Sequence, residues 1–266
     1  RMNQWLLGSG LPIDAVNRVR KSVSRIKGGG LLSALGERPS RALAISDVPG
    51  NEPGVIGSGL LVAEVGLVEG VAGLDLPKWL SDCVERGLAE RGALPMLGPQ
   101  IELVATLETA KSAAADAGRR AGLAVRIDTQ PVEGDAALVG RHLARALLDG
   151  PPGLSITGGE TTLCLPDAPG RGGRNQHLAL AAAIELAGHA DAVLLSAGTD
   201  GTDGPTDDAG ALVDGATLER IRDAGLDADR GLRRADSGTL LEASGDLIRT
   251  GPTGTNVMDL ILGWRG

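Results

Sequence analysis

The chain has 266 residues, of which 26 are basic and 34 acidic, and its formal net charge is −8. This length is enough for one large α/β domain or two small ones with a hydrophobic core. The acidic balance argues against a nucleic-acid-binding protein, which needs a basic patch, and no apolar run reaches the ~18 residues of a membrane span. Two cysteines fit a reducing compartment, and the first residues lack a secretion-signal pattern. We therefore expect a cytoplasmic globular protein that binds neither nucleic acid nor membrane.

The first half of the chain predicts an isolated helix and then a regular alternation of strands and helices. Apolar residues recur at steps of three and four over 12–27, which is typical of an amphipathic helix that ends at Gly28–Gly30. A short strand is expected at 42–45 and a helix at 77–91. The alternating segments that follow are 101–106, 107–121, 123–127 and 135–148. Such alternation indicates βαβ units and a parallel sheet.

The segment Pro151-Pro152-Gly153 is stiff and turn-prone, and it predicts a boundary between domains 1–150 and 151–266. After it we expect strands at 154–157 and 161–165, joined by a turn at Gly158-Gly159. The remaining expected elements are an Ala-rich helix at 174–188, a strand at 193–197, helices near 217–224 and 237–244, and strands at 247–249 and 257–262.

Several common catalytic motifs are missing from the sequence. There is no Gly-Lys dipeptide, which excludes a P-loop, and no G-x-G-x-x-G, which argues against an ordinary dinucleotide site. No G-x-S-x-G elbow is present either. The three histidines lack metal-ligand spacing, and a structural role is expected for His142 and His177, which lie in predicted helices.

Four polar, Gly-rich loops each follow an apolar strand, and they cover 46–51, 157–162, 198–208 and 250–256. One such loop is an ordinary turn. Four in one chain indicate a ligand site, because ligands bind beyond the carboxyl ends of strands in open α/β sheets.

Two further features give this site its charge. Arg171 and Arg174 lie in a Gly-rich segment at a predicted helix start, and guanidinium groups beside free N–H groups favour phosphate or carboxylate. Asp200, Asp203 and Asp207 do not match the calcium loop, whereas Mg²⁺ takes one or two carboxylates and substrate phosphates. Together they predict phosphoryl transfer from a magnesium nucleotide. A solvated basic turn and turn-capping carboxylates are the structural alternatives.

The loops together resemble one family, the glycerate kinases of the MOFRL type, which are often labelled hydroxypyruvate reductases. In the second half the matching motifs are TGGETT at 157–162, GRGGRNQ at 170–176, LLSAGTDGTDGPTDDAGALVD at 194–214, DS at 236–237 and TGPTGTNVMDL at 250–260. The first half is similar to the C-terminal part of the family's other domain through LLGSG at 6–10, NRVRKSVSRIKGG at 17–29, SDVPGN at 46–51 and EGDA at 133–136.

This resemblance implies a fold of two α/β domains, a truncated Rossmann-like parallel-sheet domain followed by a mixed-sheet MOFRL domain. It also implies transfer of a phosphoryl group from ATP to D-glycerate with Mg²⁺, giving 2-phosphoglycerate. The family's Gly-Lys-Ala motif and SGGGSAL loop are missing, its SGPT-x-x-D segment is replaced at 58–64, and Asn51 stands where the family usually has Asp. We therefore expect a shortened N-terminal domain, with the native start upstream as one explanation.

The resemblance and the residue types assign candidate roles. Arg174, Asp200, Asp203 and Lys27 are the expected catalytic residues, with Mg²⁺ or the attacking hydroxyl at Asp200 and Asp203. The expected substrate and ATP contacts are Arg20, Asp47, Gly158, Gly159, Glu160, Arg171, Asn175, Thr202 and Asn256.

Two other functions stay open at this point. One is a catalytically inactive homologue that acts as a ligand-binding module, and the other is a hydroxypyruvate reductase, which the missing dinucleotide motif disfavours. A homo-oligomer, or a separate chain that supplies the missing N-terminal segment, is likewise left open.

Overall fold

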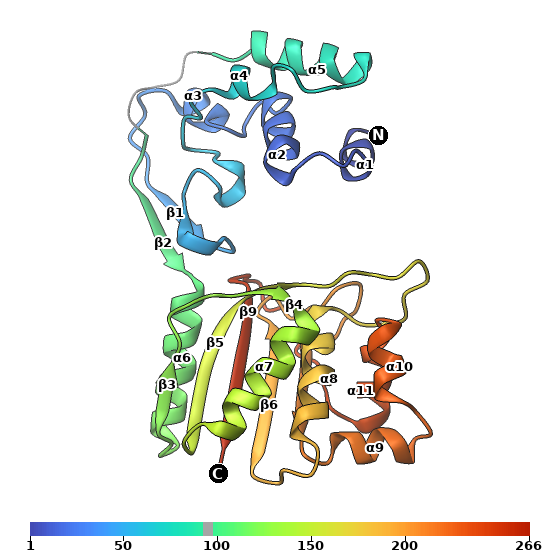
Figure 1. Ribbon diagram of the computed structural model, residues 1–266. Coiled ribbons are helices and arrows are strands. Elements are labelled where there is room, and N and C mark those ends of the chain that lie inside the picture. Colours follow the sequence, from blue (N-terminus) through green and yellow to red (C-terminus); the bar gives the residue numbers. More distant parts are fainter. Residues whose placement is uncertain (93–97) are drawn as a thin grey trace. The chain divides into compact units, whose positions relative to one another are not determined.

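A computed structural model describes residues 1–92 and 98–266 (Figure 1). The chain forms two compact units, the first made of Arg1–Ala44 and Gly50–Val104, the second of Ile45–Pro49 and Ala105–Gly266. The predicted α/β class, with parallel and antiparallel strand pairs in one sheet, is confirmed. The compact units divide near residue 105, so that Pro151-Pro152-Gly153 lies within the second unit.

The first unit is built mainly from short helices. Its elements are α1 (Met2–Gly8), α2 (Ile13–Ser22), α3 (Gly30–Leu35), β1 (Ala42–Ile45), η1 (Pro49–Asn51), η2 (Ile56–Ser58), α4 (Leu67–Val71), α5 (Lys78–Ala89) and β2 (Ile101–Ala105). The apolar stripe predicted at 12–27 does face a core, where Val16 and Val19 of α2 pack with Leu80 and Val84 of α5. The helix ends earlier than predicted, at Ser22, because the chain then turns and the Ser24 hydroxyl accepts the Lys27 N–H.

The second unit is a mixed sheet covered by helices. Its elements are α6 (Leu107–Arg120), β3 (Val125–Ile127), β4 (Val132–Asp135), α7 (Ala136–Asp149), β5 (Gly153–Thr162), α8 (Arg174–Leu186), β6 (Ala192–Gly198), β7 (Gly210–Asp214), α9 (Thr217–Asp223), α10 (Ala228–Arg233), α11 (Ser237–Ser244), β8 (Leu247–Ile248) and β9 (Asp259–Arg265). The strand order is β3-β5-β9-β6-β7-β8, and β4 also pairs with β5. The parallel β3–β5 pair, with α7 between the two strands in sequence, is the βαβ unit that the alternation predicted, whereas β4, which also pairs with β5, was not predicted.

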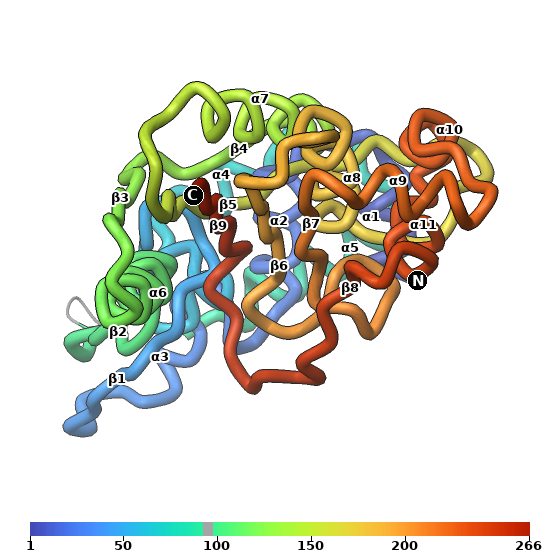
Figure 2. Tube along the Cα trace, turned by 90° about the horizontal axis from the view of Figure 1, so that it is seen from below, coloured from blue at the N-terminus to red at the C-terminus, as the bar shows by residue number. Residues whose placement is uncertain are grey.

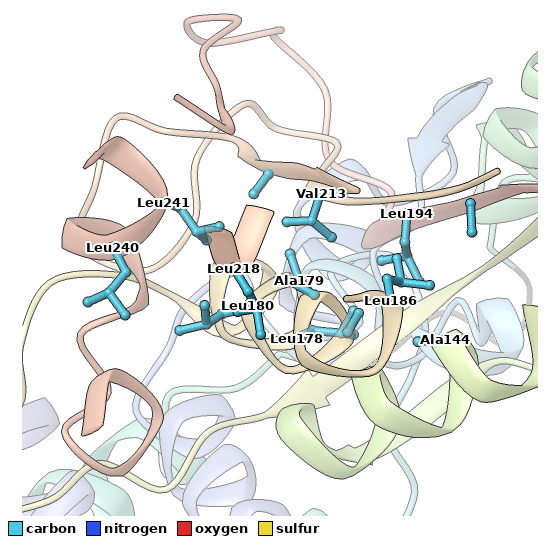
Figure 3. Close-up of a cluster of buried hydrophobic side chains, with 14 of the residues drawn as sticks. Ala144, Leu178, Ala179, Leu180, Leu186, Leu194, Val213, Leu218, Leu240 and Leu241 are labelled. Atoms are coloured by element: carbon cyan, nitrogen blue, oxygen red, sulfur yellow. The ribbon is translucent and has the colours of Figure 1, made fainter. Parts of the chain in front are cut away.

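The two faces of this sheet bury different clusters. On one face Leu178 and Leu186 of α8 pack with Ala144 of α7 and Leu194 of β6, as Figure 3 shows. On the other face α6 contributes Ala115, which packs with neighbouring apolar residues of β5. Figure 2 shows α7 and α6 on opposite sides of β5. The Ala-rich helix α8 is therefore central to the core, and its first turn is fixed by the packing around it.

One local prediction was wrong. Gly158 and Gly159 do not form a turn between two strands; they lie inside β5, which runs without a break from Gly153 to Thr162. A Cβ atom on Gly159 would lie 2.2 Å from the Val132 carbonyl oxygen, and one on Gly158 would lie 2.5 Å from that of Asp259. The glycines therefore serve the close approach of β4 and β9 to β5.

Candidate active site

The first turn of α8 is capped by a carboxylate from a distant loop. Asp203 accepts hydrogen bonds from the backbone N–H groups of Asn175 (3.0 Å) and Gln176 (2.8 Å), and its side chain is buried. These are helix-terminal N–H groups that have no partner within the helix. Burial raises the pKa of Asp203 above its ordinary value, although the hydrogen bonds from Gln176 and Asn175 oppose that rise. Asp203 thus fixes the helix start against the 199–209 loop.

The glycines before α8 allow this close packing. A Cβ atom on Gly173 would lie 2.4 Å from atoms of Asp203, and one on Gly170 would lie 2.3 Å from the Asp236 Cβ. Asp236 also accepts the Arg171 backbone N–H at 2.9 Å. The GRGGRNQ segment is therefore packed tightly between the loops that carry Asp203 and Asp236. Gly170 and Gly173 leave no room for a Cβ atom against these two residues.

Arg174, the first residue of α8, lies between two carboxylates. Its guanidinium meets Asp259 in a two-pronged arrangement, with Nε 2.6 Å from Oδ2 and Nη2 3.1 Å from Oδ1, and Nη1 is 2.7 Å from Glu160 Oε1. Burial disfavours the charged form, but Asp259, Glu160 and Asp203 together raise the pKa of Arg174. Such planar pairing fixes the guanidinium at the N-terminus of α8.

Two of the predicted polar loops are fastened to each other beside Arg174. Thr253 donates its hydroxyl to the Thr199 carbonyl (2.6 Å) and its N–H to the Asp200 carbonyl (3.1 Å). The Thr199 hydroxyl in turn donates to the Met258 carbonyl at 2.7 Å. Met258 has φ +71°, a left-handed conformation that costs a residue with a side chain about 1–3 kcal/mol. The strained residue directly precedes Asp259, the buried partner of Arg174.

Arg171 belongs to a different cluster of charges. Its Nη2 lies 2.5 Å from Asp208 Oδ2, and Arg249 Nε lies 2.7 Å from the other oxygen of the same buried carboxylate. Glu242 pairs with both arginines and closes the ring. This ring borders a cavity of about 730 Å³ that is lined by the 205–208 segment together with Arg171 and Arg249. Arg171 and Arg174, both predicted to hold a phosphate or carboxylate, therefore have separate carboxylate partners.

Three other predicted contacts of the second unit make hydrogen bonds within the fold. Asn175 is buried, and its Oδ1 accepts the Ser196 hydroxyl at 2.6 Å. Asn256 Oδ1 accepts the Met258 N–H at 3.0 Å, and the Thr202 N–H donates to Asp200 Oδ1 at 2.9 Å. Asn175 is therefore a packing residue of the α8 start, whereas Asn256 and Asp200 shape the turns of their loops.

The predicted residues of the first half are distributed over both units. Arg20 and Lys27 lie in the first unit, and Asp47, which is exposed, belongs to the second through the segment 45–49. Lys27 Nζ donates to the Ser58 hydroxyl at 2.8 Å. The carbonyls of Lys27 and Gly28 accept bonds from the Arg91 guanidinium at 2.7 and 2.9 Å.

The predicted pair of magnesium ligands does not fit this geometry. Both oxygens of Asp203 accept backbone N–H groups beneath the start of α8, so that this carboxylate is directed into the protein. Within residues 1–92 and 98–266 no group of three or more His, Cys, Asp or Glu side chains is placed to hold a metal ion. Of the two predicted ligands, Asp200 is the one that could still bind Mg²⁺, because both oxygens of Asp203 are used in the helix cap.

Sequence reasoning missed Asp259 and Asp208, the two buried carboxylates that hold the arginines. Asp259 had a signal, because it is the single charge in the apolar segment 257–262, and a charge at such a position needs a partner when buried. Asp208 had none, because it is one of four aspartates between 200 and 208.

Comparison with known proteins gives the family. A family model described as MOFRL family matches residues 153–259, and a domain of unknown function, DUF4147, matches residues 1–72. A protein from Agrobacterium vitis named "Putative hydroxypyruvate reductase" is 36% identical, with 97% of this chain and 71% of that protein covered. This chain belongs to the MOFRL-type glycerate kinase family.

Glycerate kinase from Thermotoga maritima matches this chain in both sequence and structure. The "D-glycerate 2-kinase" of Thermotoga maritima is 37% identical over 99% of this chain and 65% of its own length. A crystal structure of glycerate kinase from the same organism superposes with a TM-score of 0.85 at 36% identity, covering 99% of this chain and 66% of that one. The chain thus spans slightly less than two thirds of these relatives. No helix in the described part of the chain is long and apolar enough to cross a membrane.

Proposed function

We propose that this protein transfers the γ-phosphoryl group of ATP to the C2 hydroxyl of D-glycerate, giving 2-phosphoglycerate and ADP. The names of its relatives support the reaction class. The observation that carries the proposal is Arg174, a guanidinium at the start of α8 between a buried and an exposed carboxylate. Positioning and charge stabilisation supply most of the catalysis in phosphoryl transfer, and a fixed guanidinium at a helix N-terminus provides both.

The two carboxylates of Arg174 have different roles in this proposal. The Asp259 side chain is 5% exposed and holds the guanidinium in place, whereas that of Glu160 is 46% exposed. An incoming phosphate or carboxylate of the ligand takes the place of Glu160 on Nη1, while Asp259 keeps its two bonds. Arg174 can therefore bind an anion, and without one its guanidinium is still paired with carboxylates.

Phosphoryl transfer also needs a group that orients the attacking hydroxyl. Asp200, in the loop that follows β6, is the proposed residue, because both oxygens of Asp203 cap α8. The hydroxyl oxygen bonds to the γ-phosphorus as the bond to the β–γ bridging oxygen breaks, and the hydroxyl proton passes to the carboxylate or to water. In the second unit Asp47, Arg171 and the 250–256 loop are further proposed ligand contacts, and in the first unit Arg20 and Lys27 are proposed ligand contacts through their positive charge.

Of the predicted pair of magnesium ligands, Asp200 is the residue that would hold Mg²⁺, because both oxygens of Asp203 accept backbone N–H groups. We further propose a cytoplasmic protein with a family-domain division at 150–151, in agreement with a MOFRL match that begins at 153.

A coupled ADP-release assay with D-glycerate and ATP tests the proposal. Turnover that requires D-glycerate is the expected result. Binding of both ligands without ADP release would favour the inactive ligand-binding module, and oxidation of NADH with hydroxypyruvate would favour the reductase named among the relatives.

A further inference from the structure

An unusual backbone segment in the first unit holds the side chain of Lys27. Gly57, Ser58 and Gly59 have φ values of +58°, +65° and +66°. This left-handed conformation suits glycine and is unfavourable for a residue with a Cβ atom. At Gly59 a Cβ atom would lie 2.6 Å from the Gly54 carbonyl oxygen, which requires glycine there. Ser58 therefore carries a side chain at a backbone conformation that glycine would adopt with less strain.

The Ser58 side chain has a specific contact at this position. Its Oγ accepts a hydrogen bond of 2.8 Å from Lys27 Nζ, and its carbonyl accepts the Gly28 N–H at 2.9 Å. The Gly29 N–H donates to the Gly59 carbonyl at 2.7 Å. From another side the Arg91 guanidinium binds the carbonyls of Lys27 and Gly28. Both the backbone and the ammonium of Lys27 are thus fixed.

We propose that Ser58 is a positioning residue for Lys27, an inference that rests on the proposed function. A lysine ammonium carries three donors, so that its bond to Ser58 leaves two for a phosphate or carboxylate oxygen. Lysine otherwise loses much side-chain freedom when it binds a ligand, and an ammonium that is already held avoids part of that loss. The hydroxyl explains why a non-glycine residue occupies this left-handed position.

Two variants at Ser58 separate the hydroxyl from the backbone. Both Ser58→Ala and Ser58→Gly remove the hydroxyl, but only the glycine variant relieves the left-handed backbone. We therefore expect Ser58→Gly to have a melting temperature about 2–4 °C above that of Ser58→Ala. If Ser58 acts through Lys27, the two variants lose ligand binding equally although their stabilities differ.

The chain has four lysines, Lys21, Lys27, Lys78 and Lys111, so labelling of each amine can be followed by mass spectrometry. The full chain is labelled with trace acetic anhydride at increasing concentrations of ATP or of D-glycerate, with exposed Lys78 as the internal reference. We expect at least one ligand to protect Lys27. In both Ser58 variants Lys27 should label faster without ligand, and half-protection should require about tenfold more ligand, equivalent to about 1.4 kcal/mol.

Equal protection curves for Lys27 in the parent and both variants would overturn the positioning role and leave the proposed function standing. A defect in Ser58→Ala that is absent from Ser58→Gly would assign the effect to the backbone and also overturn it. If neither ligand protects Lys27 in the parent, the inference fails at its basis, whereas the proposed function is decided independently by ADP release.

Discussion

The side chain of Arg174, in the first turn of α8, pairs with Asp259 and Glu160, whose side chains are 5% and 46% exposed. Asp203, one loop away, lies under the same turn and caps it. Three carboxylates at one helix start thus have three environments. Asp259 anchors the guanidinium, Glu160 occupies the position that a ligand would take, and Asp203 caps the helix. These different roles follow from the burial of each carboxylate and from the donors that it faces.

Glu160→Gln tests the proposed exchange of Glu160 for a ligand anion. Glutamine keeps the size of the side chain but removes the charge that competes for Arg174. Because a partly exposed ion pair is worth about 1 kcal/mol or less, affinity for ATP or D-glycerate should rise about two- to fivefold in calorimetry. Exposed Glu219→Gln on α9 is the matched control and should leave affinity unchanged. Weaker binding in Glu160→Gln would mean that the carboxylate itself serves the ligand.

Asp203 predicts a characteristic dependence of stability on pH. Because burial raises its pKa in the folded state, the folded protein holds this proton more tightly than the unfolded chain does. The Asp203 contribution to stability therefore falls as pH rises from about 4, its unfolded value, through the raised folded value. Asp203→Asn removes this contribution and loses one cap bond, costing about 0.5–2 kcal/mol at low pH.

Urea unfolding of the parent and Asp203→Asn between pH 3.5 and 7.5 measures this effect. The difference in unfolding free energy between the two should shrink as pH rises. A difference that grows with pH would show that the charged carboxylate is the stabilised form.

At the scale of elements, β5 is the strand that organises the second unit. It pairs with β3, β4 and β9, and its end carries Glu160. The sequence pattern indicated a strand on either side of Gly158-Gly159, but a pair of glycines between Thr157 and Glu160 suggests a turn as readily as a tight strand contact. The contacts with β4 and β9 decide in favour of a continuous strand. Because β4 lies 26 residues before the glycines and β9 about 100 residues after them, the local sequence pattern does not contain these contacts.

Gly159→Ala should disrupt the pairing of β4 with β5. The added methyl group would lie 2.2 Å from the Val132 carbonyl oxygen, a backbone atom that moves only with its strand. We expect a loss of about 2–4 kcal/mol in the unfolding free energy, measured by urea denaturation. Gly8→Ala is the control, because a Cβ atom there meets open space and the change should be within about 0.5 kcal/mol. A Gly159→Ala protein as stable as the parent would contradict the close packing of β4.

At the scale of the whole molecule, the α/β class, the family and most helices were predictable from the sequence. Amphipathic spacing found α2, a helix was also expected where α5 lies, and long ordered motifs identified the family. The grouping of the chain into compact units was not predictable, because the segment 45–49 joins the second unit through the Ser46 N–H and the Ala105 carbonyl, far apart in sequence. The site was predicted as a set of loops. Which carboxylate each arginine meets depends on packing that only the fold supplies.

Arg174 is proposed to bind the anions of a phosphoryl transfer to the C2 hydroxyl of D-glycerate. The most direct measurement is ³¹P NMR of the product formed from ATP and D-glycerate by the 266-residue chain and by Arg174→Lys. We expect 2-phosphoglycerate with an equal amount of ADP, and a rate about 10- to 100-fold lower in the variant, because lysine cannot bind Asp259 and a ligand at once. An Arg174→Lys protein as fast as the parent, or a product phosphorylated at another position, would contradict it.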